Sequence, residues 1–155
     1  MPVLVLALLI GVIAGLRSMT APAAVSWAAH LGWLKLGGTP LAFLGATVTP
    51  YVFTLFAIGE LIADKLPTTP SRKSAGPFTA RVVIGAFCGA AIGLGAGALA
   101  GGLVAGALGA VIGTLGGYEF RMRLVAATGG RDLPIALLED AIAVAGAAWI
   151  VSSIP

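Results

Sequence analysis

Apolar residues dominate the chain, and a few polar clusters divide it into long apolar stretches. These stretches cover residues 1–16, 41–63, 82–117 and 133–153. A helix needs about 20 mostly apolar residues to cross the hydrocarbon core of a bilayer, which is about 30 Å thick. Because the stretch 82–117 is long enough for two crossings, the pattern predicts an all-α integral membrane protein with about five transmembrane helices. All of residues 1–155 are predicted to form a single domain.

Glycine returns at almost every fourth position within residues 82–117. This spacing places the glycines on one helix face, where a second helix can approach closely. As one helix the stretch would be roughly 54 Å long, so it must fold back on itself. We predict a glycine-zipper hairpin with its hinge at Gly101-Gly102. The predicted helix-packing residues are Gly85, Gly89, Gly93, Gly97, Gly101, Gly109 and Gly113.

A shorter segment, residues 21–36, follows the polar cluster 17–20. Pro22 suits the first turn of a new helix, and Trp27 and Lys35 are residue types that favour the boundary between lipid and water. We therefore predict a short interfacial or re-entrant helix after the first span.

Composition supports a membrane protein and excludes several other classes. The chain is 59% apolar and 10% charged, with a mean hydropathy of +1.05. Its formal charge is +3, but the nine basic residues are scattered and form no basic patch, so nucleic acid is not an expected partner. Cys88 and His30 are each the only residue of their type, which gives no metal-ligand spacing. We expect no metal, no cofactor, and membrane lipids as partners.

Lysine and arginine are unevenly distributed between the predicted loops. Two of them, Arg17 and Lys35, fall on the side opposite the N-terminus. The other seven fall on the side of the N-terminus: Lys65, Arg72, Lys73, Arg81, Arg121, Arg123 and Arg131. By the positive-inside rule, the N-terminus and the polar loop 67–81 are predicted to be cytoplasmic, and the C-terminus periplasmic or extracellular. The expected location is the bacterial plasma (inner) membrane.

A weak internal repeat appears when the chain is shifted by 98 residues. The shift aligns Gly11 with Gly109 and Gly15 with Gly113. In a five-span topology these two segments cross the membrane in opposite directions, so the match predicts an inverted repeat of the kind found in transporters.

Two segments carry a resemblance to a known family. They are residues 15–22, GLRSMTAP, and 60–67, ELIADKLP, with further matches at 70–72 and 80–81. With these motifs the chain resembles a family of small bacterial polytopic membrane proteins catalogued as a domain of unknown function. The resemblance covers most of the chain and implies a compact helical membrane fold, but it implies no activity and no site residues.

The candidate site consists of charged residues near the ends of the predicted spans. Glu60 and Asp64 share one helix face, where like charges repel unless a cation or proton neutralises them. The predicted topology places Glu139 and Asp140 at the same cytoplasmic level, whereas Arg17 is predicted on the outer side, beside a helix break that could hold an anion. Two interpretations remain open: an interfacial salt-bridge network, or a cytoplasmic mouth whose carboxylates bind a cation or relay protons.

Three functional classes are compatible with these patterns. A small transporter or channel for an ion or small polar solute is favoured by the close glycine packing, the broken helices and the carboxylates. The alternative is a non-transporting scaffold or accessory subunit, in which the charges would only reach lipid headgroups. An intramembrane enzyme is not expected, because the sequence offers no nucleophile with an adjacent base. Short helices rich in small residues enclose little volume, so we also predict a homodimer or larger homo-oligomer.

Overall fold

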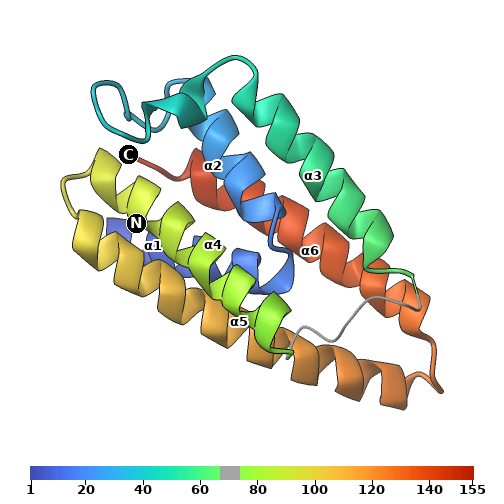
Figure 1. The fold of residues 1–155 in the computed structure, drawn as a ribbon. Helices are drawn as coiled ribbons and strands as arrows, with labels where there is room; N and C mark the ends of the chain where they lie inside the picture. Colours follow the sequence, from blue (N-terminus) through green and yellow to red (C-terminus); the bar gives the residue numbers. More distant parts are fainter. Residues whose placement is uncertain (67–73) are drawn as a thin grey trace.

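The computed structural model describes residues 1–66 and 74–155, and in these residues the chain is helical without strands (Figure 1). The all-α prediction is confirmed for this part of the chain. The helices are α1 (Val3–Leu16), α2 (Thr20–His30), α3 (Thr49–Ala63), α4 (Ala75–Gly95), α5 (Leu99–Ala127) and α6 (Asp132–Ser152), with a short 3₁₀ helix η1 (Ala42–Gly45). Residues 67–73 of the predicted polar loop 67–81 lie outside the described residues, and most of its remainder begins α4.

Three of the helices, α4, α5 and α6, are long and apolar enough to cross a membrane, and α1 and α3 are shorter apolar helices. Such a set of helices fits a membrane protein. The shorter helices have 14 and 15 residues, below the number of about 20 that a perpendicular crossing needs.

Helices α4 and α5 form the antiparallel hairpin that the glycine spacing predicts. A Cβ atom added to Gly89 or Gly93 would lie closer than 3.0 Å to the backbone of α5, at Gly102 and Ala98 respectively. The predicted hinge position is wrong, because Gly102 lies inside α5 and faces the backbone of α4. The chain turns earlier, at Gly97, whose φ of +74° suits glycine.

Two of the predicted packing glycines have other roles. Gly97 belongs to the turn, and no atom lies within 4 Å of the position of its Cβ. Gly101 faces the side chain of Leu4 on α1 rather than the backbone of α4. The spacing of four identified the correct face of α4, but it could not distinguish a turn glycine from a packing glycine.

Helix α1 packs against α5 in a parallel direction. Gly11 faces Gly106, and Gly15 faces Ala110, so later residues of one helix meet later residues of the other. The inverted repeat requires antiparallel copies and is therefore wrong. The two copies also differ in shape, since α1 ends at Leu16 while α5 continues to Ala127.

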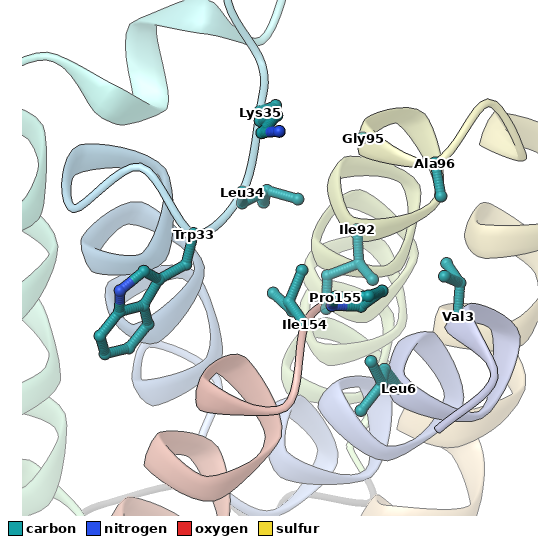
Figure 2. Close-up of a pocket in the computed structure, with 10 residues that line it drawn as sticks. All are labelled: Val3, Leu6, Trp33, Leu34, Lys35, Ile92, Gly95, Ala96, Ile154 and Pro155. Carbon is teal, nitrogen blue, oxygen red and sulfur yellow. The ribbon is translucent and has the colours of Figure 1, made fainter.

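Helix α2 returns along α1 to the end where the chain begins. It starts three residues after Arg17, and the residues that follow it, Leu34 and Lys35, line a small pocket together with Val3 (Figure 2). This interior position does not fit the predicted interfacial helix, and the re-entrant alternative stays a prediction. The physical reason is that α2 presents the small side chains of Ala21 and Ala28 to the protein interior, where both are fully buried.

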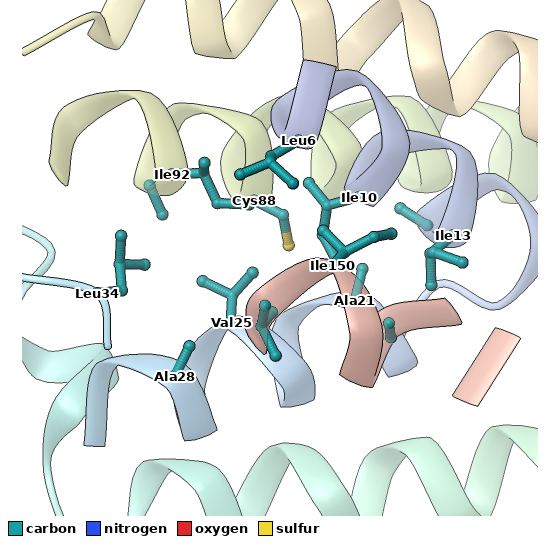
Figure 3. Close-up of a cluster of buried hydrophobic side chains, with 14 of the residues drawn as sticks. Leu6, Ile10, Ile13, Ala21, Val25, Ala28, Leu34, Cys88, Ile92 and Ile150 are labelled. Atoms are coloured by element: carbon teal, nitrogen blue, oxygen red, sulfur yellow. The ribbon is translucent and has the colours of Figure 1, made fainter. Parts of the chain in front are cut away.

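The apolar core lies between α1, α4, α2 and α6. Figure 3 shows Ile10 of α1, Val25 of α2, Cys88 of α4 and Ile150 of α6 pointing toward one another, and all four are buried. Helix α3 contributes only Pro50 as a buried residue. It therefore lies at the edge of the bundle, as Figure 1 shows.

Both chain ends lie at the same end of the helix bundle. Val3, Ile154 and Pro155 line one pocket (Figure 2), and the N and C labels lie near each other in Figure 1. The two ends share one end of the bundle because α2 runs back along α1, whereas the side of the membrane that each terminus faces stays a prediction. We call this end the terminal end and the opposite end, at Arg17, the Arg17 end.

Candidate ion-pair site at the Arg17 end

The site begins with a helix break. α1 ends at Leu16, and Arg17 has an extended backbone with φ −141° and ψ 107°, while its N–H still donates to the carbonyl oxygen of Ile13 at 2.7 Å. This change of direction turns the Arg17 side chain into the protein, where its exposed fraction is 0%. A guanidinium cannot lose its proton in a protein, so it needs carboxylate partners there.

Carboxylates of α6 and of the residue that caps α3 supply those partners. Arg17 Nε donates to Asp140 Oδ1 at 2.7 Å, and Nη2 lies 2.6 Å from the same oxygen. Arg17 Nη1 donates to Asp64 Oδ2 and lies 3.8 Å from Glu139 Oε1. The prediction that Arg17 lies apart from the carboxylates is wrong. Helix α2 runs from the Arg17 end to the terminal end, and α3 then runs back, so Asp64 lies at the same end as Arg17. The predicted anion site at Arg17 loses its basis, since an anion there would face three carboxylates.

Lys65 and Arg121 extend this network. Lys65 Nζ donates to the carbonyl oxygen of Leu61 at 2.9 Å and to Asp140 Oδ2. Arg121 of α5 binds Asp132 through two hydrogen bonds of 3.0 and 2.9 Å, and its Nη1 lies 3.7 Å from Glu139 Oε2. The network thus joins α5 and α6 as well as α1 and α3.

Glu60 has a different role from Asp64. Its carboxylate accepts the backbone N–H groups of Ser18 at 2.7 Å and Met19 at 2.8 Å, and the Ser18 hydroxyl at 2.5 Å. These bonds satisfy N–H groups that a helix start leaves without partners. Glu60 therefore fixes the turn between α1 and α2.

Arg81 of α4 completes that turn from the other side. Its Nη1 donates to the carbonyl oxygen of Gly15 at 2.8 Å, and its Nη2 lies 4.0 Å from Glu60 Oε1. The predicted repulsion between Glu60 and Asp64 is thus relieved by separate partners, because Asp64 pairs with Arg17 while Glu60 lies near Arg81. Both carboxylates are neutralised by groups of the protein itself.

From the sequence, Arg81 was counted only as a loop charge, although its spacing from the glycines of α4 could have placed it on a packed helix face. It lies four residues before Gly85 and eight before Gly89, so it occupies the glycine face of α4, which packs against α5 and reaches α1 at Gly85. Lys65 and Arg121 were placed near the correct level but were not assigned partners.

Among the described residues, the inner part of the network contains equal numbers of opposite charges. We call it the ion-pair cluster: Arg17, Lys65, Arg81 and Arg121 with Glu60, Asp64, Glu139 and Asp140. Removing one partner of a buried pair leaves an uncompensated charge and typically costs about 3–5 kcal/mol. Within residues 1–66 and 74–155, no group of three or more His, Cys, Asp or Glu side chains is arranged to hold a metal ion.

Comparison with known proteins finds no match to a protein family, a curated protein or a solved structure. The resemblance to a family of unknown function stays a prediction. The function therefore has to be argued from the ion-pair cluster and its surroundings.

Proposed function

We propose that this chain is a small membrane transporter or channel for an ion or small polar solute. The observation that carries the proposal is the fully buried guanidinium of Arg17, which binds Asp64 and Asp140 among apolar helices of membrane-spanning length. Ionisable groups inside a membrane protein are costly, and they commonly mark the path of an ion or substrate.

The helices divide into two layers that differ in how they pack. We interpret the backbone contacts of α1, α4 and α5, for example at Gly11, Gly85 and Gly106, as a glycine zipper that forms a rigid core layer. Helices α2, α3 and α6 form the outer layer. α3 holds to α2 partly through a hydrogen bond of 2.9 Å from Trp27 Nε1 to Thr54 Oγ1. Moving α3 away from the bundle should therefore disrupt less packing than moving α1, α4 or α5.

Such a movement would act on the ion-pair cluster. The pair Arg17–Asp64 joins α3 to α1, and the pair Lys65–Asp140 joins it to α6. When α3 moves away, Asp64 loses Arg17, and Asp140 loses Lys65 but keeps Arg17. A cation entering from the Arg17 end then takes the place of the lost partners. If the entering cation replaces the side chain of Arg17 or Lys65, no buried carboxylate is left unpaired, and the free-energy cost of an unpaired charge is avoided.

The arrangement of the helices also suggests a topology. We infer six passes between the two ends of the bundle instead of five, because α2 also runs between them. Lys35 lies at the terminal end, whereas the other six described Lys and Arg residues lie at the Arg17 end: Arg17, Lys65, Arg81, Arg121, Arg123 and Arg131. The positive-inside rule then favours a plasma-membrane protein whose Arg17 end is cytoplasmic and whose two termini lie outside.

A homodimer or larger homo-oligomer is also part of the proposal. The outward face of α5 exposes Leu108, Ile112 and Leu115, and no atom lies within 4 Å of the Cβ position of Gly116. Large and small side chains side by side suit the approach of a helix from a second copy. A monomeric mass in several mild detergents and in nanodiscs would contradict this part.

Cation flux into liposomes tests the transport proposal. Proton-, sodium- and potassium-sensitive dyes would report flux for the wild-type protein, Asp64→Asn and Asp140→Asn, each normalised to folded protein. Asp132→Asn is the matched control, since Asp132 pairs only at the surface with Arg121 and its side chain is 59% exposed. We expect wild-type flux that both cluster variants lower about tenfold or more and the control does not.

The scaffold alternative is favoured by one observation, the pairing of Arg17, Asp64 and Asp140 with one another. A scaffold predicts no flux above that of empty liposomes for the wild-type protein and a lower melting temperature for both cluster variants. That result would reject transport of these cations.

A further inference from the structure

A second feature of the molecule is an apolar groove between α3 and α6, with α2 as its floor. Its volume is about 710 Å³. The walls include Ala57 and Leu61 of α3 and Val144 and Ala148 of α6, and Trp27 of α2 lies in the floor. Binding sites for small molecules have volumes of about 300–1,000 Å³ and mostly apolar walls, so the groove has the size and character of such a site.

One end of the groove meets the ion-pair cluster at Lys65. Leu61 of the groove lies one helical turn before Lys65, and Val144 lies one turn after Asp140. Lys65 Nζ hydrogen-bonds to the carbonyl oxygen of Leu61 and to Asp140 Oδ2. The ammonium group therefore stands at the polar end of an apolar groove.

Lys65 is also more accessible than Arg17, the other cation that binds Asp140. Its side chain is 24% exposed, whereas that of Arg17 is 0% exposed. An ammonium group has three N–H donors, and the contacts described above use two of them. The third can donate to an anionic oxygen that arrives from outside the protein.

We propose that this groove holds one acyl chain of a membrane phospholipid, with its phosphate bound by Lys65. Lys65 already binds one carboxylate, Asp140, and its third N–H is the donor left for a phosphate oxygen, which is a strong acceptor for an ammonium group. The lengths agree as well. Along the floor, the distance from Thr20 to Leu31 is roughly 17 Å at 1.5 Å per residue, and one leaflet contributes about half of a 30 Å hydrocarbon core.

A helix from a second copy is the alternative occupant of the groove, and the crosslinking experiment below distinguishes it from a lipid chain. The lipid site does not depend on transport and would exist equally in a scaffold.

Photocrosslinking in nanodiscs tests the chain-binding part of the proposal. The probe is a phosphatidylglycerol with a diazirine in one acyl chain, and mass spectrometry locates the labelled residues. We expect labelling on the groove-facing residues between 54 and 61 and between 144 and 152. Ala148→Phe fills the groove and should lower this labelling about tenfold, equivalent to about 1.4 kcal/mol of binding free energy.

Ala145→Phe is the matched control for this experiment. Ala145 is exposed on the same helix but does not line the groove, so its variant should label like the wild type. Equal labelling of Ala148→Phe and Ala145→Phe would overturn the site. Crosslinks between two copies of the chain at the groove residues, in place of lipid labelling, would also overturn it.

Competition tests the role of Lys65. Unlabelled phosphatidylglycerol should compete better than diacylglycerol with the same chains, since only the former has a phosphate. Lys65→Gln should abolish this preference, and Lys65→Arg, which keeps the charge, should retain it. A preference that persists in Lys65→Gln, or competition by diacylglycerol equal to that by phosphatidylglycerol in the wild type, would overturn the phosphate contact.

Discussion

Arg17 and Asp140 are 123 positions apart in the sequence, yet Arg17 Nε donates a hydrogen bond of 2.7 Å to Asp140 Oδ1. This contact joins the break after α1 to α6. Because Asp140 also accepts a bond from Lys65, one carboxylate links three separate segments of the chain at the Arg17 end.

Arg17→Ala should be strongly destabilising. The substitution leaves Asp64 and Asp140 without their buried cation, and the expected cost is about 3–5 kcal/mol in the free energy of unfolding. Denaturant titration in detergent micelles measures this cost. Arg123→Ala is the control, since Arg123 is exposed and its loss should change stability by less than about 0.5 kcal/mol. Equal effects of the two substitutions would show that the ion-pair cluster adds no stability.

Gly106→Ala and Gly116→Ala should change stability in opposite directions. A Cβ on Gly106 would lie closer than 3.0 Å to the backbone of α4 at Gly89, so overpacking should cost at least about 1–3 kcal/mol. Gly116 has no atom within 4 Å of that position, so its alanine variant should gain about 0.5–1 kcal/mol from helix propensity. Thermal unfolding of both variants in one detergent provides the comparison, and a neutral Gly106→Ala would contradict close packing.

Glu60→Gln should lower the stability of the fold and leave the flux per folded molecule unchanged. The carboxylate accepts bonds from the N–H groups of Ser18 and Met19 and from the Ser18 hydroxyl. An amide has only one acceptor oxygen, so we expect a loss of about 1–3 kcal/mol in stability. Flux per folded molecule should match the wild type. Reduced flux at unchanged stability would instead place Glu60 on the ion path, as one interpretation of the sequence had it.

Cysteine labelling should show both chain ends on one side of the membrane. In a Cys88→Ala background, single cysteines at Pro2 and Ser153 should react with an impermeant maleimide added outside intact cells. A cysteine at Thr128 should react only after the cells are opened, because it lies beyond α5 at the Arg17 end. Labelling of the Pro2 and Ser153 positions from opposite sides would return the topology to an odd number of crossings.

The sequence predicted the helical class and the α4–α5 hairpin because both depend on local patterns, namely hydropathy and the spacing from Gly85 to Gly93. It failed on the direction of α2. That helix has 11 residues, too few to look like a span, and its interior position depends on contacts of Val25 and Ala28 with distant helices.

The error in α2 also separated the candidate site into two parts. Glu60, Asp64, Glu139 and Asp140 were expected at one level, and the structure brings them to one end. Arg17 was placed at the opposite end only because one helical pass was missing. Two residues lie at the same end of the bundle only if the chain runs an even number of times between the two ends from one residue to the other. Hydropathy alone does not give this number, because it does not reveal a helix as short as α2.

Gly11, Gly85 and Gly106 meet at one level of the core layer, where the backbone of each helix touches the other two. Three helices in such contact leave no channel for even a single water molecule along their common axis at that level. The common axis of α1, α4 and α5 is therefore closed at that level, and the ion pairs of Arg17 with Asp64 and Asp140 lie outside this three-helix contact.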